Sequence, residues 1–96
     1  MYREMVSAEP RYVAHQNLAA SMLDGEAVIL NLKDGNYYGL NTVGAEVWRW
    51  LHEPKTVEEL VGLMTAQYEV DTGTARQDVE RLLRDLEARH LIQAVS

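Results

Sequence analysis

The chain has 96 residues, of which 47% are hydrophobic and 25% charged, as expected for one folded domain with one core. Its formal net charge of −6 argues against strong binding to nucleic acid or to an anionic membrane surface, because both need a basic face. Cysteine is absent, which excludes disulfides, thiolate metal sites and thiol nucleophiles.

The first 16 residues show no clear period. They mix Pro10 with charged and isolated apolar residues, so residues 1–16 are predicted to form an irregular N-terminal arm and residues 17–96 a single domain. The start of the chain lacks the apolar stretch of a secretory signal, and no apolar run approaches the roughly 18 residues that span a bilayer. A cytoplasmic protein is therefore expected.

Two turns then separate three strand-like runs, at residues 18–23, 26–32 and 36–40. Each turn contains Asp-Gly, at Asp24-Gly25 and Asp34-Gly35, and this pair is a strong hairpin signal because Gly accepts the positive φ of tight turns. The order predicts an antiparallel meander in which the nearly continuous apolar run 26–32 is central. The run 36–40 is left at an edge.

Helical periodicity follows. Asn41 or Thr42 is suited to cap a first helix, Thr56 forms a capping box with Glu59 at the start of a second, and a third spans about residues 71–89. The apolar stripes expected to face the core are Val43, Val47, Trp50 and Leu51; Val57, Leu60, Val61 and Met64; and Ala75, Val79, Leu82, Leu83 and Leu86.

Together these elements predict an α+β fold of order β-β-β-α-α-α. Three strands cannot bury their apolar face alone, so the helices are expected to cover one side. Trp48 and Trp50 diverge by about 200° on their helix, which places Trp50 in the core and Trp48 at the sheet edge or partly exposed. Residues 91–95 are expected either to pack back on the core or to form a short final strand.

No catalytic constellation emerges. His15, His52 and His90 lie in three different elements, and no HExxH, GxSxG, GxGxxG or P-loop motif occurs. Neither an enzymatic activity nor a metal or cofactor is expected. The alternating charges of residues 76–89 form either a solvated face or the rim of a groove that selects a partner, and both interpretations stay open.

The edge strand Asn36–Leu40 has no charge, Pro or bulge of the kind that normally protects a sheet edge. Gly39 lets another backbone approach closely. Strand alternation turns Tyr38 towards the helices and Tyr37 either towards solvent or over the N-terminal arm. These features favour β-strand addition, in which an extended peptide pairs with the free edge.

Four motifs occur in a fixed order. They are G-x-Y-Y-x-L-N at Gly35–Asn41, G-A-x-V-W at Gly44–Trp48, T-V-E-E-L at Thr56–Leu60, and D-V-x-x-L-L-x-x-L at Asp78–Leu86 followed by L-I. With these motifs the sequence resembles the PqqD-like proteins, also called RiPP precursor peptide recognition elements, over about residues 18–92. The double Tyr in a free-standing chain of this length is most similar to the lasso-peptide biosynthesis members.

The resemblance implies a winged-helix-like fold and no enzymatic activity. It implies that the leader of a ribosomally made precursor peptide lies as a fourth strand against the third strand, in the cleft facing the third helix. The bound precursor is then presented to processing enzymes, which in lasso systems are a cysteine leader peptidase and an ATP-dependent macrolactam synthetase. The residues expected to bind or support the peptide are Leu30, Asn36, Tyr37, Tyr38, Gly39, Leu40, Arg76, Asp78, Val79, Leu82, Leu83, Arg84, Asp85 and Leu86.

The alternative interpretation is a winged-helix DNA-binding or regulatory domain, since the second half of the chain also has the pattern of a helix-turn-helix. Residues 41–96 contain six Lys/Arg against ten Asp/Glu. This balance is poor for phosphate contact and disfavours the alternative.

Overall fold

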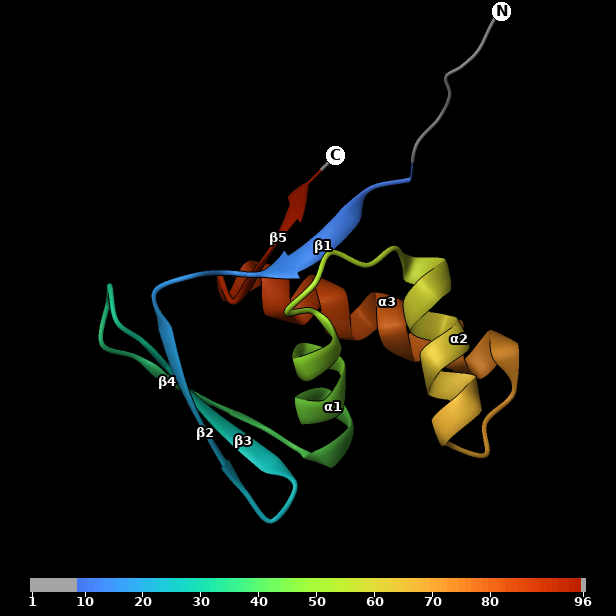
Figure 1. Ribbon diagram of the computed structural model, residues 1–96, viewed down its shortest axis with the longest axis horizontal. Helices are drawn as coiled ribbons and strands as arrows, with labels where there is room; N and C mark the ends of the chain where they lie inside the picture. The colour runs from blue at the N-terminus through green and yellow to red at the C-terminus, as the bar shows by residue number, and fades with distance from the viewer. Residues whose placement is uncertain (1–8, 96) are drawn as a thin grey trace, which may run out of the picture.

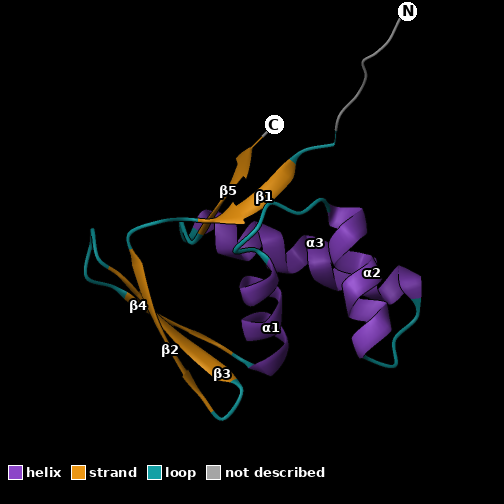
Figure 2. Cartoon of the chain, viewed as in Figure 1, coloured by secondary structure: helices purple, strands orange, loops and turns teal. Residues whose placement is uncertain are grey.

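The computed structural model describes residues 9–95. Its elements in chain order are β1 (Arg11–Ala14), β2 (Leu18–Leu23), β3 (Glu26–Asn31), β4 (Tyr37–Leu40), α1 (Thr42–Trp50), α2 (Val57–Gln67), α3 (Thr72–Ala88) and β5 (Ile92–Val95). Strands β2, β3 and β4 form an antiparallel sheet in that order, with α1 against one face and α2 and α3 beyond it (Figures 1 and 2). The predicted α+β fold, a three-stranded meander with three helices, is confirmed.

The two tight turns of the meander have the predicted chemistry. Gly25 and Gly35 have φ values of +83° and +77°, a region that side chains rarely adopt. Asn31 stabilises the second turn, because its Oδ1 accepts the N–H of Lys33 at 2.8 Å. In the resulting register Ile29 of β3 lies opposite Tyr38 of β4.

Local capping explains where α1 and α2 begin. The Asn41 side chain accepts the N–H of Gly44 at 2.9 Å. At α2 the Thr56 hydroxyl accepts the N–H of Glu59 at 3.1 Å, and the Glu59 carboxylate accepts the N–H of Thr56 at 2.9 Å, which is the predicted capping box. The hydrogen bond from Thr56 holds the pKa of Glu59 below its usual value, with a smaller contribution from the nearby Arg11 guanidinium.

The buried face of α1 differs from the prediction. Trp48 is only 5% exposed and belongs to the core, whereas Trp50 packs at its margin and Val43 is exposed. The buried face also contains Gly44 and Ala45, and a Cβ built at Gly44 would lie 3.5 Å from the Leu40 side chain of β4. A prediction based only on large apolar side chains therefore misplaces the buried face of α1 by about one residue.

The predicted irregular arm contains a strand. Strand β1 pairs antiparallel with β5, and Arg11 lies opposite Val95. Tyr12 also exchanges hydrogen bonds of 2.8 and 2.9 Å with Lys55, in the loop before α2. The short segment shows no period, because its partner strand lies at the far end of the chain and leaves no local signal. Residues 1–8 of the predicted arm lie outside the described residues.

The final segment resolves the two possibilities that the sequence left open. It forms the strand β5, and its first residue, Ile92, is buried together with the preceding Leu91. Within residues 9–95 no helix is long and apolar enough to cross a membrane, and no group of three or more His, Asp or Glu side chains could hold a metal ion.

Candidate functional site

Strand β4 lies at an edge of the three-stranded sheet, and the hydrogen-bond pattern shows which of its backbone groups are free. The N–H of Asn31 donates to the carbonyl of Asn36 at 2.9 Å. Hydrogen-bonded and non-hydrogen-bonded pairs alternate along an antiparallel ladder. The backbone of Tyr38 therefore bonds to β3, whereas Tyr37 and Gly39 direct their N–H and C=O groups towards the open edge.

A groove lies between this edge and α3. We call it the β4–α3 groove, and it encloses about 200 Å³. Its lining residues are Tyr38, Gly39, Leu40, Asn41, Gly44, Leu82, Asp85, Leu86 and Arg89. It is an open surface depression lined by both polar and apolar side chains, with one charge of each sign, Asp85 and Arg89.

The orientation of the tyrosines in β4 agrees with the prediction. Tyr38 and Leu40 pack against the core on the helix side of the sheet. Tyr37 points to the opposite face and is 70% exposed. The adjacent tyrosines thus have different surroundings, and only Tyr38 has its side chain in the groove.

Arg89 was not anticipated from the sequence. Its Cζ lies 5.8 Å from the centroid of the Tyr38 ring, a cation–π geometry between two residues that line the groove. Arg89 follows Leu82 by seven residues and Leu86 by three, so helical spacing alone would have placed it on the same face of the helix as these two groove residues. Asn41 and Gly44 were also not predicted to line the groove, because Asn41 was interpreted only as the cap of the first helix.

Several predicted binding residues do not line the groove. Leu30 lies opposite Tyr37 on the outer face of the sheet, because strand alternation turns it away from the helices. Val79 and Leu83 are buried in the core and do not line the groove. Arg84 lies on the other side of α3, beside Tyr12 and Val57.

The remaining predicted polar contacts are engaged elsewhere. Arg76 forms an ion pair with Glu58 of α2, and Asp78 pairs with Arg81 within α3 at 2.6 Å. Both Arg76 and Asp78 therefore stand outside the groove lining. Of the charged residues predicted on α3, only Asp85 lies at the groove.

The chain is similar in sequence and fold to known proteins. The family model described as coenzyme PQQ synthesis protein D (PqqD) matches residues 26–92. TbiB1, solved in complex with the TbiA(beta) leader peptide, is 33% identical to this chain in sequence. The two structures superpose with a TM-score of 0.79, and the match covers 88% of this chain and 98% of that chain. A lasso peptide synthetase B1 complexed with the leader peptide has a TM-score of 0.75 at 21% identity, covers 85% of this chain and 96% of that one, and supports the fold. No curated protein matches the chain.

Proposed function

Because the chain belongs to the PqqD family, we propose that it binds the leader segment of a ribosomally synthesised precursor peptide as a fourth strand on β4. The observation that carries this proposal is the free edge of β4 beside the β4–α3 groove, where Tyr37 and Gly39 direct their backbone groups outward. The leader-peptide complex of the 33% identical TbiB1 supports it.

Backbone pairing provides the general part of the affinity. The N–H and C=O groups of Tyr37 and Gly39 would bond to alternate residues of the peptide, each bond contributing about 0.5–1.5 kcal/mol. Gly39 presents no side chain to hinder the approach, and a Cβ built there would meet nothing within 4 Å. The four-residue length of β4 limits the paired segment to a short stretch of peptide.

Side-chain contacts provide the specificity. Every second residue of an added strand points to the helix side of the sheet and enters the β4–α3 groove. An apolar side chain there would contact the half-buried Leu82 and the buried Leu86, and an aromatic or cationic one would meet Tyr38 or Asp85. Apolar burial contributes about 25 cal/mol per Å², so one well-seated side chain is sufficient to define the register.

We propose that this binding is non-catalytic and that the chain presents the leader to a cysteine leader peptidase and an ATP-dependent macrolactam synthetase. Tethering the leader raises the local concentration of the attached core peptide at the enzymes. The groove residues account for binding through backbone, apolar and rim-charge contacts, and the proposal assigns no chemical step to any of them.

A titration with the TbiA(beta) leader peptide, followed by backbone amide shifts and hydrogen exchange, tests the proposal. We expect submicromolar to micromolar affinity, roughly −8 to −9 kcal/mol, and slowed exchange at Tyr37 and Gly39. A scrambled peptide of the same composition is the control. Binding that slows exchange only in α2 would contradict pairing at β4, and equal binding of the scrambled peptide would contradict leader recognition.

A further inference from the structure

Two glycines line the β4–α3 groove, and the space around them differs. A Cβ built at Gly39 meets no atom within 4 Å, so the edge of β4 stays open to a peptide backbone there. A Cβ built at Gly44 of α1 would instead lie 3.3 Å from Oδ1 of Asn41 and 3.5 Å from Cβ of Leu40. Both of these neighbours also line the groove. Any side chain at position 44 would therefore narrow the groove at its corner between β4 and α1.

The corner beside Gly44 is fixed by the start of α1. Oδ1 of Asn41 accepts the N–H of Gly44 at 2.9 Å, and this hydrogen bond caps the helix. The same oxygen is the atom closest to the added Cβ, so moving it away would weaken the cap. On the other side of the corner, Leu40 packs against the core. Neither wall can withdraw freely, so the groove is open at this corner because position 44 has no side chain.

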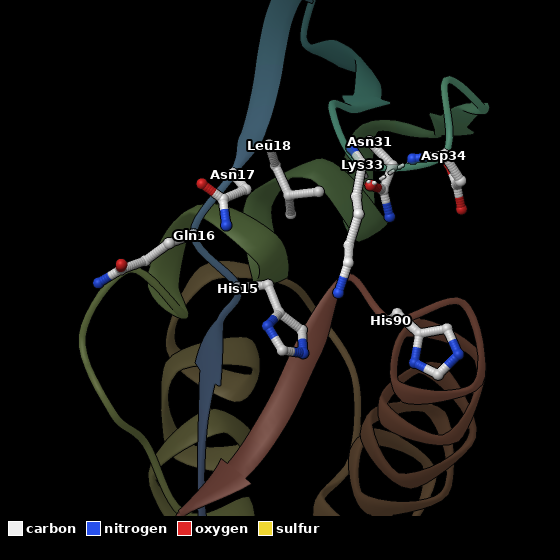
Figure 3. A pocket seen from close by; sticks show the side chains of 8 residues that line it. All are labelled: His15, Gln16, Asn17, Leu18, Asn31, Lys33, Asp34 and His90. Atoms are coloured by element: carbon white, nitrogen blue, oxygen red, sulfur yellow. Dashed lines mark hydrogen bonds between the residues drawn. The ribbon is translucent and has the colours of Figure 1, made fainter.

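A larger hollow of the chain lies apart from this corner. It encloses about 330 Å³ and is lined by residues 15–18, by the end of β3 with the turn that follows it, and by His90 (Figure 3). These eight residues are all different from the residues that line the groove. A peptide side chain that enters the groove is therefore limited in size by the groove walls and gains no room from this hollow.

In a strand added to β4, the peptide residue opposite Leu40 points to the same face of the sheet as Leu40 and enters the groove beside Gly44. We propose that Gly44 sets the size of this peptide side chain, and that the groove takes an apolar side chain of about four to six carbon atoms. The upper limit follows from the groove volume of about 200 Å³, since a methyl-sized group occupies about 30 Å³, as a water molecule does. Burial of each further carbon favours filling this space. The assignment rests on the proposed function and deepens it, because it names the residue that selects the peptide by size.

Selection from an mRNA-display library of random 16-residue peptides tests the assignment. The baits are the full chain, the Gly44→Ala variant and the control Gly62→Ala, which makes the same change in α2, where an added Cβ meets no atom within 4 Å. Wild type and the control should enrich Leu, Ile, Met or Phe at one position of the motif paired with β4, and Gly44→Ala should enrich Val or Ala there. Thermal unfolding checks each bait. If Gly44→Ala does not fold, Asn41→Ser is added to it, because Ser is a shorter N-cap that relieves the contact at 3.3 Å, and the Asn41→Ser single variant is then the control.

A matched pair of peptides decides the assignment. The peptide selected by wild type, and a version one carbon shorter at the groove position, are titrated against wild type and Gly44→Ala. Wild type should bind the longer peptide about fourfold more tightly, and Gly44→Ala should bind the shorter one more tightly by about the same factor, because the added methyl group overfills the groove. The same preference in both proteins, an equal loss for both peptides with Gly44→Ala, or no enriched apolar residue with wild type overturns the assignment of Gly44 alone. If selected peptides leave the amides of Tyr37 and Gly39 unprotected from exchange, the proposed function fails instead.

Discussion

Replacing Gly39 by Pro removes one outward N–H from β4 without removing a bond between β3 and β4. Because the ladder alternates, the backbone of Tyr38 holds β4 to β3, and the Gly39 N–H is reserved for an incoming strand. The ring also restricts φ, but the preceding Tyr38 is already in a strand, a conformation that a following Pro favours. The fold should therefore persist while the edge loses one of its donors.

The expected loss of affinity follows from the energies of hydrogen bonds. Removing the bond costs about 1 kcal/mol, and leaving the peptide carbonyl buried without a partner costs about a further 1–2 kcal/mol. The sum of about 2–3 kcal/mol corresponds to roughly 30- to 150-fold weaker binding. Fluorescence anisotropy with labelled TbiA(beta) leader peptide measures the ratio.

The matched control is Gly39→Ala, which keeps the N–H and adds a Cβ into open space. It should bind within about threefold of wild type, because no neighbouring atom lies within 4 Å of that Cβ. Thermal unfolding of both variants checks that the fold is intact. If Gly39→Pro remains folded and binds as tightly as wild type, the peptide does not pair with β4 at this position.

Three other predictions concern the groove, the core and the caps. Leu82→Asp places a carboxylate in the groove and should weaken leader binding at least tenfold in the same anisotropy assay, with a smaller effect on urea unfolding, because Leu82 is only half-buried. Trp48→Ala should destabilise the fold by about 3–5 kcal/mol in urea and Trp50→Ala by less than half as much, and the reverse order would contradict the observed burial of α1. Thr56→Ala should cost about 1 kcal/mol and lower Tm by about 4–8 °C, since it removes the capping box. Because the pKa of Glu59 is lowered in the folded state, the contribution of its carboxylate to stability is present above about pH 4.3 and is lost as pH falls through the folded-state pKa. Glu59→Gln should therefore flatten the acid side of a curve of Tm against pH. An unchanged curve would show that the cap does not titrate.

Local chemistry made much of the fold predictable. The turns at Gly25 and Gly35 require positive φ, and the caps at Asn41 and Thr56 satisfy backbone N–H groups that would otherwise lack partners. Both depend on residues within three positions of one another, so the sequence contains the complete signal. The edge position of β4 follows in the same way, from the order of two consecutive hairpins.

The residues of the groove were less accessible to such reasoning. Helical spacing places Leu82, Leu83 and Asp85 near one another, but only the packing of α2 against α3 determines which of them faces β4. That packing directs Leu83 into the core and Leu82 towards the groove. An error of one position on a helix rotates a side chain by about 100°, which is enough to exchange groove for core.

The sequence by itself determined the meander, the three helices and the outward and inward tyrosines of β4, because turn, cap and alternation rules act between near neighbours. Only the tertiary structure decided the pairing of β1 with β5, the burial of Trp48 and the position of Arg89 over Tyr38. Each of these depends on elements distant in the chain. Their contact energies are realised only after the helices and strands have packed, and they leave no periodic pattern in the sequence.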